Sequence, residues 1–120
     1  MRNAGLVALL ILLGACTTAP EPVICTMEAR SSFAVTVVDS ASGENLAPSA
    51  TVRVTQGTFA DTLPAPPGAG VYSGGVYERD GDFTITVMRA GYAPWQGLVR
   101  VARDECHVIT EAVTVRLRRS

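Results

Sequence analysis

Along most of the chain, apolar side chains alternate with polar ones in short runs. In the clearest run, Phe83-Thr84-Ile85-Thr86-Val87, every second side chain is apolar. Because successive residues of a β-strand face opposite sides, this period of two predicts strands with one buried face and one face in water. No run keeps the period of an amphipathic helix. Strands are expected at residues 33–37, 50–55, 58–63, 71–77, 83–87, 95–103 and 109–117.

Turn-forming residues separate these runs. Residues 39–45 supply Asp, Ser, Gly and Asn, and residues 64–70 contain prolines and glycines that do not fit the interior of a sheet. Residues 79–82 are expected to form a tight hairpin and residues 91–94 a turn. Short strands spaced by turns, without a helix, predict an all-β fold. We expect an antiparallel seven-stranded β-sandwich of immunoglobulin-like size.

The first fifteen residues differ from the rest of the chain. Met1-Arg2-Asn3 precedes an apolar run at residues 4–13, the arrangement of a secretory signal peptide. As a helix, residues 4–15 would rise about 18 Å, well short of the roughly 30 Å hydrocarbon core of a bilayer. We therefore expect residues 1–15 to be a cleaved leader rather than a membrane span.

The leader ends in Leu13-Gly14-Ala15-Cys16, which resembles the lipobox of bacterial lipoproteins. In those proteins the cysteine receives diacylglycerol and becomes the new N-terminus, so the resemblance implies a lipid on Cys16 that anchors the protein in a membrane. The next residue is Thr17 rather than Asp, which by the same resemblance favours the outer membrane of the cell envelope. The alternative is ordinary cleavage beside a stray cysteine.

The chain after the leader divides into two parts. Residues 16–32 would form the acylated N-terminus, a short tether and a segment that carries Cys25, and residues 33–120 would form the sandwich. Cys25 and Cys106 are 81 positions apart in an oxidising compartment, so we expect a disulfide bond between them. The alternative is two free buried thiols.

The charge balance excludes one class of partner. The chain has ten basic residues, all of them arginine, and eleven acidic ones, which gives a net charge of −1. This balance supplies no basic field for a phosphate backbone, so we expect no nucleic acid as partner.

No catalytic constellation emerges, and we expect neither a metal nor a cofactor. His107 is the one histidine and directly follows Cys106. In a strand, Glu111 would lie about 13 Å from His107, which is too far to share a metal. Contact of His107 with the region of the disulfide is therefore the favoured interpretation.

Two further sites fit a structural role better than a chemical one. Asp80 and Asp82 flank Gly81 like a fragment of a calcium loop, but the other regularly spaced ligands are missing, so a hairpin is favoured. Ser73 does not fit the Gly-x-Ser-x-Gly nucleophile elbow of serine hydrolases, because Val71 stands where the first glycine is needed. We expect the protein not to be an enzyme.

The strands and turns together carry a second resemblance. The segments that carry it are residues 33–39, 42–43, 50–54, 70–72, 81–87 and 91–92. They resemble the carboxypeptidase regulatory-like domain, a transthyretin-like sandwich of about this length. The resemblance implies the fold, and it carries over no catalytic residue, because the zinc ligands of metallocarboxypeptidases lie in a separate domain.

Two aromatic residues beside Pro94 are candidate ligand contacts. Tyr92 and Trp95 lie at the predicted turn, and aromatic rings at the end of a sandwich can hold sugar rings. The alternative is structural: Tyr92 would bury its ring and bond its hydroxyl to the backbone, and Trp95 would cover the edge of the core.

These observations predict a lipid-anchored, non-enzymatic β-sandwich of the bacterial cell envelope. It would contact the membrane through the lipid on Cys16 and would bind or scaffold an envelope protein or a glycan. A glycan-binding module and an accessory subunit of an envelope hydrolase are the alternatives. The sequence does not specify an oligomeric state.

Overall fold

A computed structural model describes residues 22–120 of the chain. In this part of the chain the regular elements are β-strands, as predicted for an all-β fold. No helix there is long and apolar enough to cross a membrane. The predicted leader at residues 1–15, Cys16 and most of the tether lie outside the described residues, so the anchor stays a prediction.

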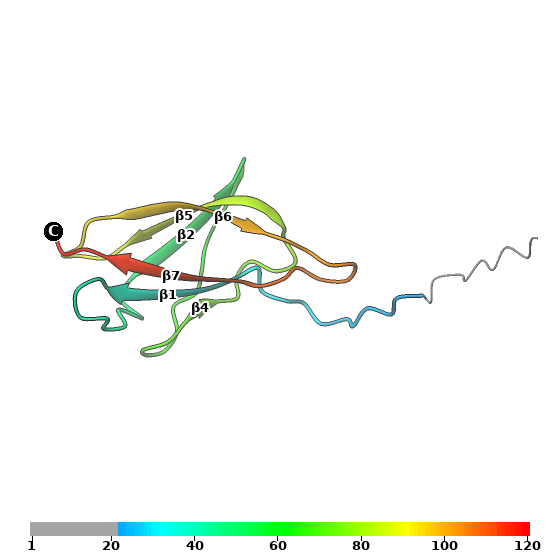
Figure 1. Ribbon diagram of the computed structural model, residues 1–120, viewed down its shortest axis with the longest axis horizontal. Helices are drawn as coiled ribbons and strands as arrows, with labels where there is room; N and C mark the ends of the chain where they lie inside the picture. The colour runs from blue at the N-terminus through cyan, green and yellow to red at the C-terminus, as the bar shows by residue number, and fades with distance from the viewer. Residues whose placement is uncertain (1–21) are drawn as a thin grey trace, which may run out of the picture.

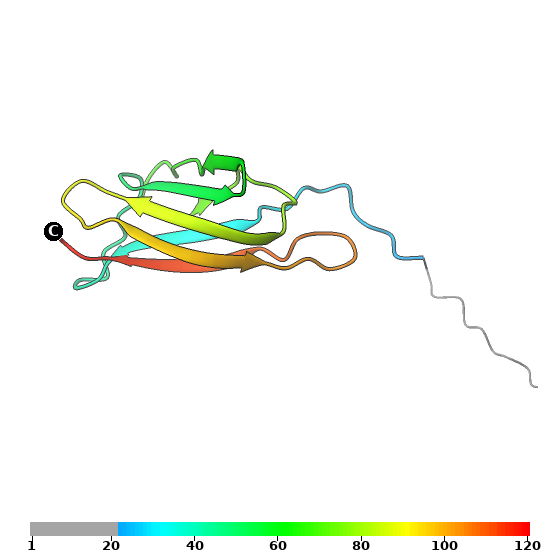
Figure 2. The ribbon, with the colours of Figure 1, turned by 90° about the horizontal axis from the view of Figure 1, so that it is seen from above.

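The strands form two sheets that face each other (Figures 1 and 2). The three-stranded sheet has the order β4-β1-β7 and contains β1 (Phe33–Asp39), β4 (Tyr72–Ser73) and β7 (Glu111–Leu117). The four-stranded sheet has the order β3-β2-β5-β6 and contains β2 (Thr51–Gln56), β3 (Phe59–Thr62), β5 (Gly81–Met88) and β6 (Trp95–Val101). Buried side chains from both sheets form one core, which is the arrangement of a β-sandwich.

The prediction that the sandwich is antiparallel throughout is wrong for one pair of strands. β1 and β7 run parallel, with Phe33 opposite Glu111 and Asp39 opposite Leu117. The other strand pairs are antiparallel. Alternation of side chains indicates which face is buried but not the direction of a strand. A short hairpin would force β1 and β7 to be antiparallel, whereas residues 40–110 between them are long enough to allow either direction.

The predicted hairpin at residues 79–82 is also wrong. β4 pairs with β1, whereas β5 pairs with β2 and β6 in the other sheet, so this segment crosses from one sheet to the other. The strand before it is shorter than the predicted residues 71–77. β4 ends at Ser73 because Gly74 follows with a φ of 79°, a left-handed conformation that leaves the strand.

The core follows the alternation of the clearest sequence run. Phe83, Ile85 and Val87 of β5 are buried, as predicted. Phe83 meets Phe33 of β1 edge to face, with the ring centroids 4.9 Å apart. Since the two rings belong to different sheets, this pair joins the sheets across the core.

Ile109 lies outside the last strand, contrary to the prediction of a strand at residues 109–117. Its side chain is 53% exposed, and it lies before β7 in the loop that connects β6 to β7. The backbone N–H of Ile109 donates to the carbonyl oxygen of Ala102 at 2.8 Å. The alternation of β7 begins to bury side chains only further along, at Val115 and Leu117.

The sandwich has two ends with different contents (Figure 1). We call one the disulfide end, and it comprises residues 22–31, 78–80 and 102–110. We call the other the Tyr92 end, and it comprises residues 40–46, 89–94 and 118–120. The N-terminal segment leaves from the disulfide end, and the last residues lie at the Tyr92 end.

Candidate functional site

The Tyr92 end is built around the buried carboxylate of Asp39, the last residue of β1. Its Oδ1 accepts hydrogen bonds from the backbone N–H groups of Ala41 and Ser42, at 2.8 and 2.9 Å. Its Oδ2 accepts one from the Tyr92 hydroxyl at 2.6 Å and one from Arg119 Nε at 3.0 Å. These donors, of which the Tyr92 hydroxyl has the largest effect, hold the pKa of Asp39 far below its ordinary value.

Tyr92 buries its ring and uses its hydroxyl in a structural hydrogen bond, which is the alternative to a ligand contact. Its side chain is 9% exposed, and its hydroxyl bonds to a side-chain carboxylate rather than to the backbone. The hydrogen bond to Asp39 raises the pKa of Tyr92, because the hydroxyl proton has an anionic acceptor. The guanidinium groups of Arg89 and Arg119 lie 5.1 and 5.8 Å from the centroid of the Tyr92 ring.

The last residues of the chain hold the Tyr92 turn in place. The N–H of Ala93 donates to the carbonyl oxygen of Arg118 at 2.9 Å, and the N–H of Ser120 donates to that of Gly91 at 3.1 Å. Tyr92 and Arg119 form an isolated antiparallel bridge. The turn between β5 and β6 is therefore extended by main-chain pairing with the residues after β7.

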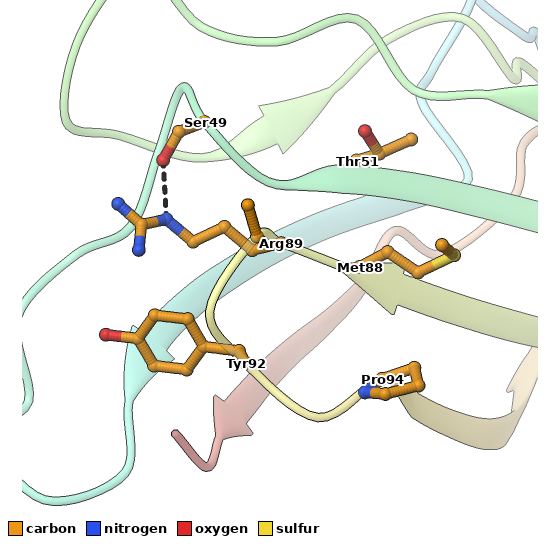
Figure 3. Close-up of a pocket in the computed structure, with 7 residues that line it drawn as sticks. Ser49, Thr51, Met88, Arg89, Tyr92 and Pro94 are labelled. Carbon is orange, nitrogen blue, oxygen red and sulfur yellow. Dashed lines mark hydrogen bonds between the residues drawn. The ribbon is translucent and has the colours of Figure 1, made fainter. Parts of the chain in front are cut away.

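A pocket of about 360 Å³ opens beside Tyr92 (Figure 3). Its lining consists of Ser49, Thr51, Met88, Arg89, Ala90, Tyr92 and Pro94. Arg89 Nε donates to Ser49 Oγ at 2.7 Å, and Ser49 Oγ donates to the carbonyl oxygen of Leu46 at 2.8 Å. In Figure 3 the Arg89 guanidinium and the Tyr92 hydroxyl extend in the same direction, away from Met88 and Pro94. The hydrogen bond to Ser49 holds the charge of Arg89 at this edge of the pocket.

Trp95 lies in a neighbouring pocket of about 300 Å³. That pocket is lined by Ala93, Pro94, Trp95, Arg116, Leu117 and Arg118. The half-buried Trp95 ring lies over Gly97 of the same strand, where a Cβ atom would collide with it. The two predicted contact residues therefore line adjacent pockets, separated by Pro94, rather than a single one.

The gathering of arginines at this end was not predicted. Four of the ten arginines gather around the turn: Arg89, Arg116, Arg118 and Arg119. The run Arg116-Leu117-Arg118-Arg119 is visible in the sequence, but Arg89 is far from it. Only the pairing of the last residues with the turn brings these arginines together.

The disulfide end contains the predicted bond between Cys25 and Cys106, whose Cα atoms are 5.1 Å apart. Cys106 lies in the loop between β6 and β7, a few residues before β7 begins. The bond ties the N-terminal segment to this loop. The alternative of two free thiols is thereby set aside.

His107 contacts the region of the disulfide, as predicted, and bridges two other side chains. Its Nε2 lies 2.9 Å from Thr26 Oγ1, and its Nδ1 lies 2.7 Å from Glu78 Oε1. With a neutral imidazole, Nδ1–H donates to Glu78 and the Thr26 hydroxyl donates to Nε2. Hydroxyl, imidazole and carboxylate thus follow one another in the order of a nucleophile, a base and its orienting acid.

Glu78 was not predicted as a member of this cluster. Its carboxylate accepts the N–H of Arg30 at 2.9 Å and the N–H of Val108 at 3.0 Å. The bond from Arg30 contributes most, and with the bonds from His107 and Val108 it lowers the pKa of Glu78 to about 2. Glu78 also has a φ of 52°, which is uncommon for a residue with a side chain and is held here by contacts on both sides.

A third pocket, of about 490 Å³, adjoins this cluster. Its lining is Val23, Ile24, Cys25, Thr26, Arg30, Asp104, Glu105, Cys106 and His107. Ile24 is 90% exposed, and the pocket therefore combines an apolar rim with acidic side chains.

Asp80 and Asp82 are placed as ion-pair partners. Asp80 lies 3.8 Å from Arg103, and Asp82 lies 3.8 Å from Arg100 on the neighbouring strand β6. Within residues 22–120, no three side chains of His, Cys, Asp or Glu gather in a way that could hold a metal ion.

Comparison with known proteins adds no relative to this picture. No protein-family model matches the chain, and no curated protein matches it. The resemblances to bacterial lipoproteins and to the carboxypeptidase regulatory-like domain therefore rest on the residues quoted for them.

Proposed function

We propose that the protein is a lipid-anchored, non-enzymatic β-sandwich of the bacterial cell envelope that binds or scaffolds an envelope partner. The observation that carries the proposal is the bond between Cys25 and Cys106, because it fixes the segment that follows Cys16 to one end of the sandwich. Residues 17–22 span about 20 Å when fully extended. An anchor on Cys16 would keep the disulfide end near the bilayer and direct the Tyr92 end away from it.

The proposed fold type is a seven-stranded, transthyretin-like sandwich of the carboxypeptidase regulatory-like kind. Sheets of three and four strands support it, as does the position of the Gly91-Tyr92 pair. Gly91 has a φ of 84° in the turn after β5, a conformation that favours glycine, so the residue that carries the resemblance has a structural reason to be there.

The anchor is tested by replacing Cys16 with serine. The wild-type protein is expected in the membrane fraction, with Thr17 directing it to the outer membrane, and the Cys16→Ser variant is expected to leave that fraction. A matched Cys25→Ser variant keeps Cys16 and should stay with the membrane. If Cys16→Ser protein still fractionates with membranes, the lipoprotein proposal is wrong.

The kind of partner distinguishes the three versions of this function. A scaffold would be recovered from detergent-solubilised membranes with another envelope protein, an accessory subunit with a hydrolase, and a glycan-binding module with polysaccharide. The arginines and the two adjacent pockets at the Tyr92 end favour the glycan version as the second candidate.

Thr26, His107 and Glu78 are hydrogen-bonded in the order of a catalytic triad, so the expectation that the protein is not an enzyme can be tested at these residues. Its contacts are sufficient for a structural role, because Glu78 holds the N-terminal segment through Arg30 and the loop before β7 through Val108. We expect the wild-type protein and a His107→Ala variant to hydrolyse p-nitrophenyl acetate at the same background rate. Turnover by the wild type that His107→Ala abolishes would show an enzyme instead.

A further inference from the structure

The guanidinium of Arg89 is positioned before any ligand arrives. Its Nε is bonded to Ser49, and its plane lies near the Tyr92 ring. Within residues 22–120 this is the one hydrogen bond that the Arg89 side chain makes, so its two terminal amino groups are available to a ligand at the edge of the pocket that Arg89 lines. A fixed guanidinium of this kind binds a carboxylate or phosphate in two parallel hydrogen bonds at little cost in side-chain entropy.

Arg116 and Arg118 add two further donors on the other side of Pro94. Both are exposed, and among the described residues neither forms an ion pair. They line the same pocket as Trp95, whose ring lies so close to Gly97 that a Cβ there would collide with it. A broad aromatic surface beside two unpaired guanidinium groups suits a ring with an apolar face and an acidic substituent.

The charges of the two ends also differ in sign. At the Tyr92 end, the carboxylate of Asp39 is already bonded to Arg119 and Tyr92, which leaves Glu44 as the other acidic side chain of residues 39–46. The disulfide end instead carries more acidic than basic side chains: Glu28, Glu78, Asp80, Asp104 and Glu105 against Arg30, Arg79 and Arg103. An anionic ligand is therefore drawn to the Tyr92 end rather than to the disulfide end.

We infer that the Tyr92 end binds an acidic glycan strand across Pro94, with one sugar ring stacked on Trp95 and its acidic groups held by Arg89, Arg116 and Arg118. A chain with repeated acidic groups matches two adjacent pockets that each contain arginine, which a single small anion does not. This deepens the proposed binding function by naming a ligand class. It does not depend on the lipid anchor.

Trp95 reports directly on this site, because it is the one tryptophan of the chain. The experiment titrates the full-length protein in detergent with oligogalacturonate, with a neutral oligosaccharide of equal length, and with inorganic phosphate. We expect a saturable change in Trp95 emission with oligogalacturonate, weaker at high salt, and no saturation in the same range with the other two probes.

Matched variants identify the residues. Arg89→Ala and the double variant Arg116→Ala/Arg118→Ala should each weaken binding about tenfold or more, since each loses charge-assisted hydrogen bonds. Arg100→Ala removes an arginine exposed on the outer face of β6 and should leave the affinity unchanged. Circular dichroism spectra and melting curves verify that every variant is folded.

Three results would overturn the inference. They are a Trp95 emission that stays constant with oligogalacturonate, an equal loss of affinity in Arg100→Ala, and phosphate binding as tightly as the oligosaccharide. The lipid anchor and the glycan site are tested independently, because Cys16→Ser protein that has left the membrane should still bind oligogalacturonate.

Discussion

The hydroxyl of Tyr92 donates a 2.6 Å hydrogen bond to the carboxylate of Asp39, 53 positions earlier in the chain. Asp39 ends β1 in the three-stranded sheet, and Tyr92 lies in the turn that leaves β5 of the four-stranded sheet. The bond therefore closes the sandwich at this end. It also fixes the turn that carries Pro94 between the two pockets.

Removal of the Tyr92 hydroxyl should destabilise the domain. In Tyr92→Phe, the buried Asp39 carboxylate loses the donor that lowers its pKa most, so we expect a melting temperature several degrees lower. Tyr77→Phe is the matched control, because the side chain of Tyr77 is largely exposed, and it should melt like the wild type. Equal melting of Tyr92→Phe and Tyr77→Phe would show that the bond contributes nothing measurable.

Acid should unfold the protein through Asp39 and Glu78. Both carboxyl groups have a pKa below the ordinary value in the folded state, so each stabilises the fold above its unfolded pKa and loses that contribution as the pH falls. For Glu78 the window runs from about pH 4.5 down to about 2. Urea midpoints measured from pH 7 to pH 2 should fall through this window, and Glu78→Gln should flatten that part of the curve. A wild-type midpoint that stays constant down to pH 2 would contradict the prediction.

What the sequence predicts well in this protein is local. The alternation in β5 identifies Phe83, Ile85 and Val87 as buried, because the sequence of a strand alone indicates which of its faces is apolar. The direction of β7 beside β1 is not local, since it depends on how the intervening strands are placed. Glu78 was missed for the same reason, as its bonds reach Arg30 and His107 at distant positions.

The candidate site likewise has a part that the sequence predicts and a part that it does not. The pairing of Cys25 with Cys106 could be predicted because, once Cys16 is assigned to the lipid, the two remaining cysteines allow one pairing. The arginines around Tyr92 could not, because residues 118–120 reach the turn only through main-chain pairing after β7.

Loss of the disulfide should weaken the fold considerably. The double variant Cys25→Ser/Cys106→Ser frees a loop with a sequence separation of 81, which the chain-entropy model values at about 4 kcal/mol of unfolding free energy. Urea unfolding measures this loss. Dithiothreitol should lower the midpoint of the wild type and leave that of the double variant unchanged. A wild type that is indifferent to the reductant would show that the bond does not stabilise the fold.

The contact between Phe33 and Phe83 should contribute strongly to stability. Phe83→Ala leaves a cavity between the two sheets and should cost about 3–5 kcal/mol of unfolding free energy. Leu98→Ala removes a side chain that is 85% exposed on β6 and should change stability little. Chemical denaturation measures the unfolding free energy of both variants. A similar small loss of unfolding free energy in each would show that Phe83 does not lie at the centre of the core.

Gly97 should control the position of the Trp95 ring. A Cβ at this residue would collide with the ring, so Gly97→Ala is expected to push the ring outward, shift its emission to longer wavelength and increase its quenching by iodide. The same displacement should weaken binding of oligogalacturonate if Trp95 provides the stacking surface. Gly68→Ala is the matched control, because a Cβ there meets no atom within 4 Å, and it should leave both emission and binding as in the wild type. A displaced ring with unchanged affinity would contradict the inference that a sugar ring stacks on Trp95.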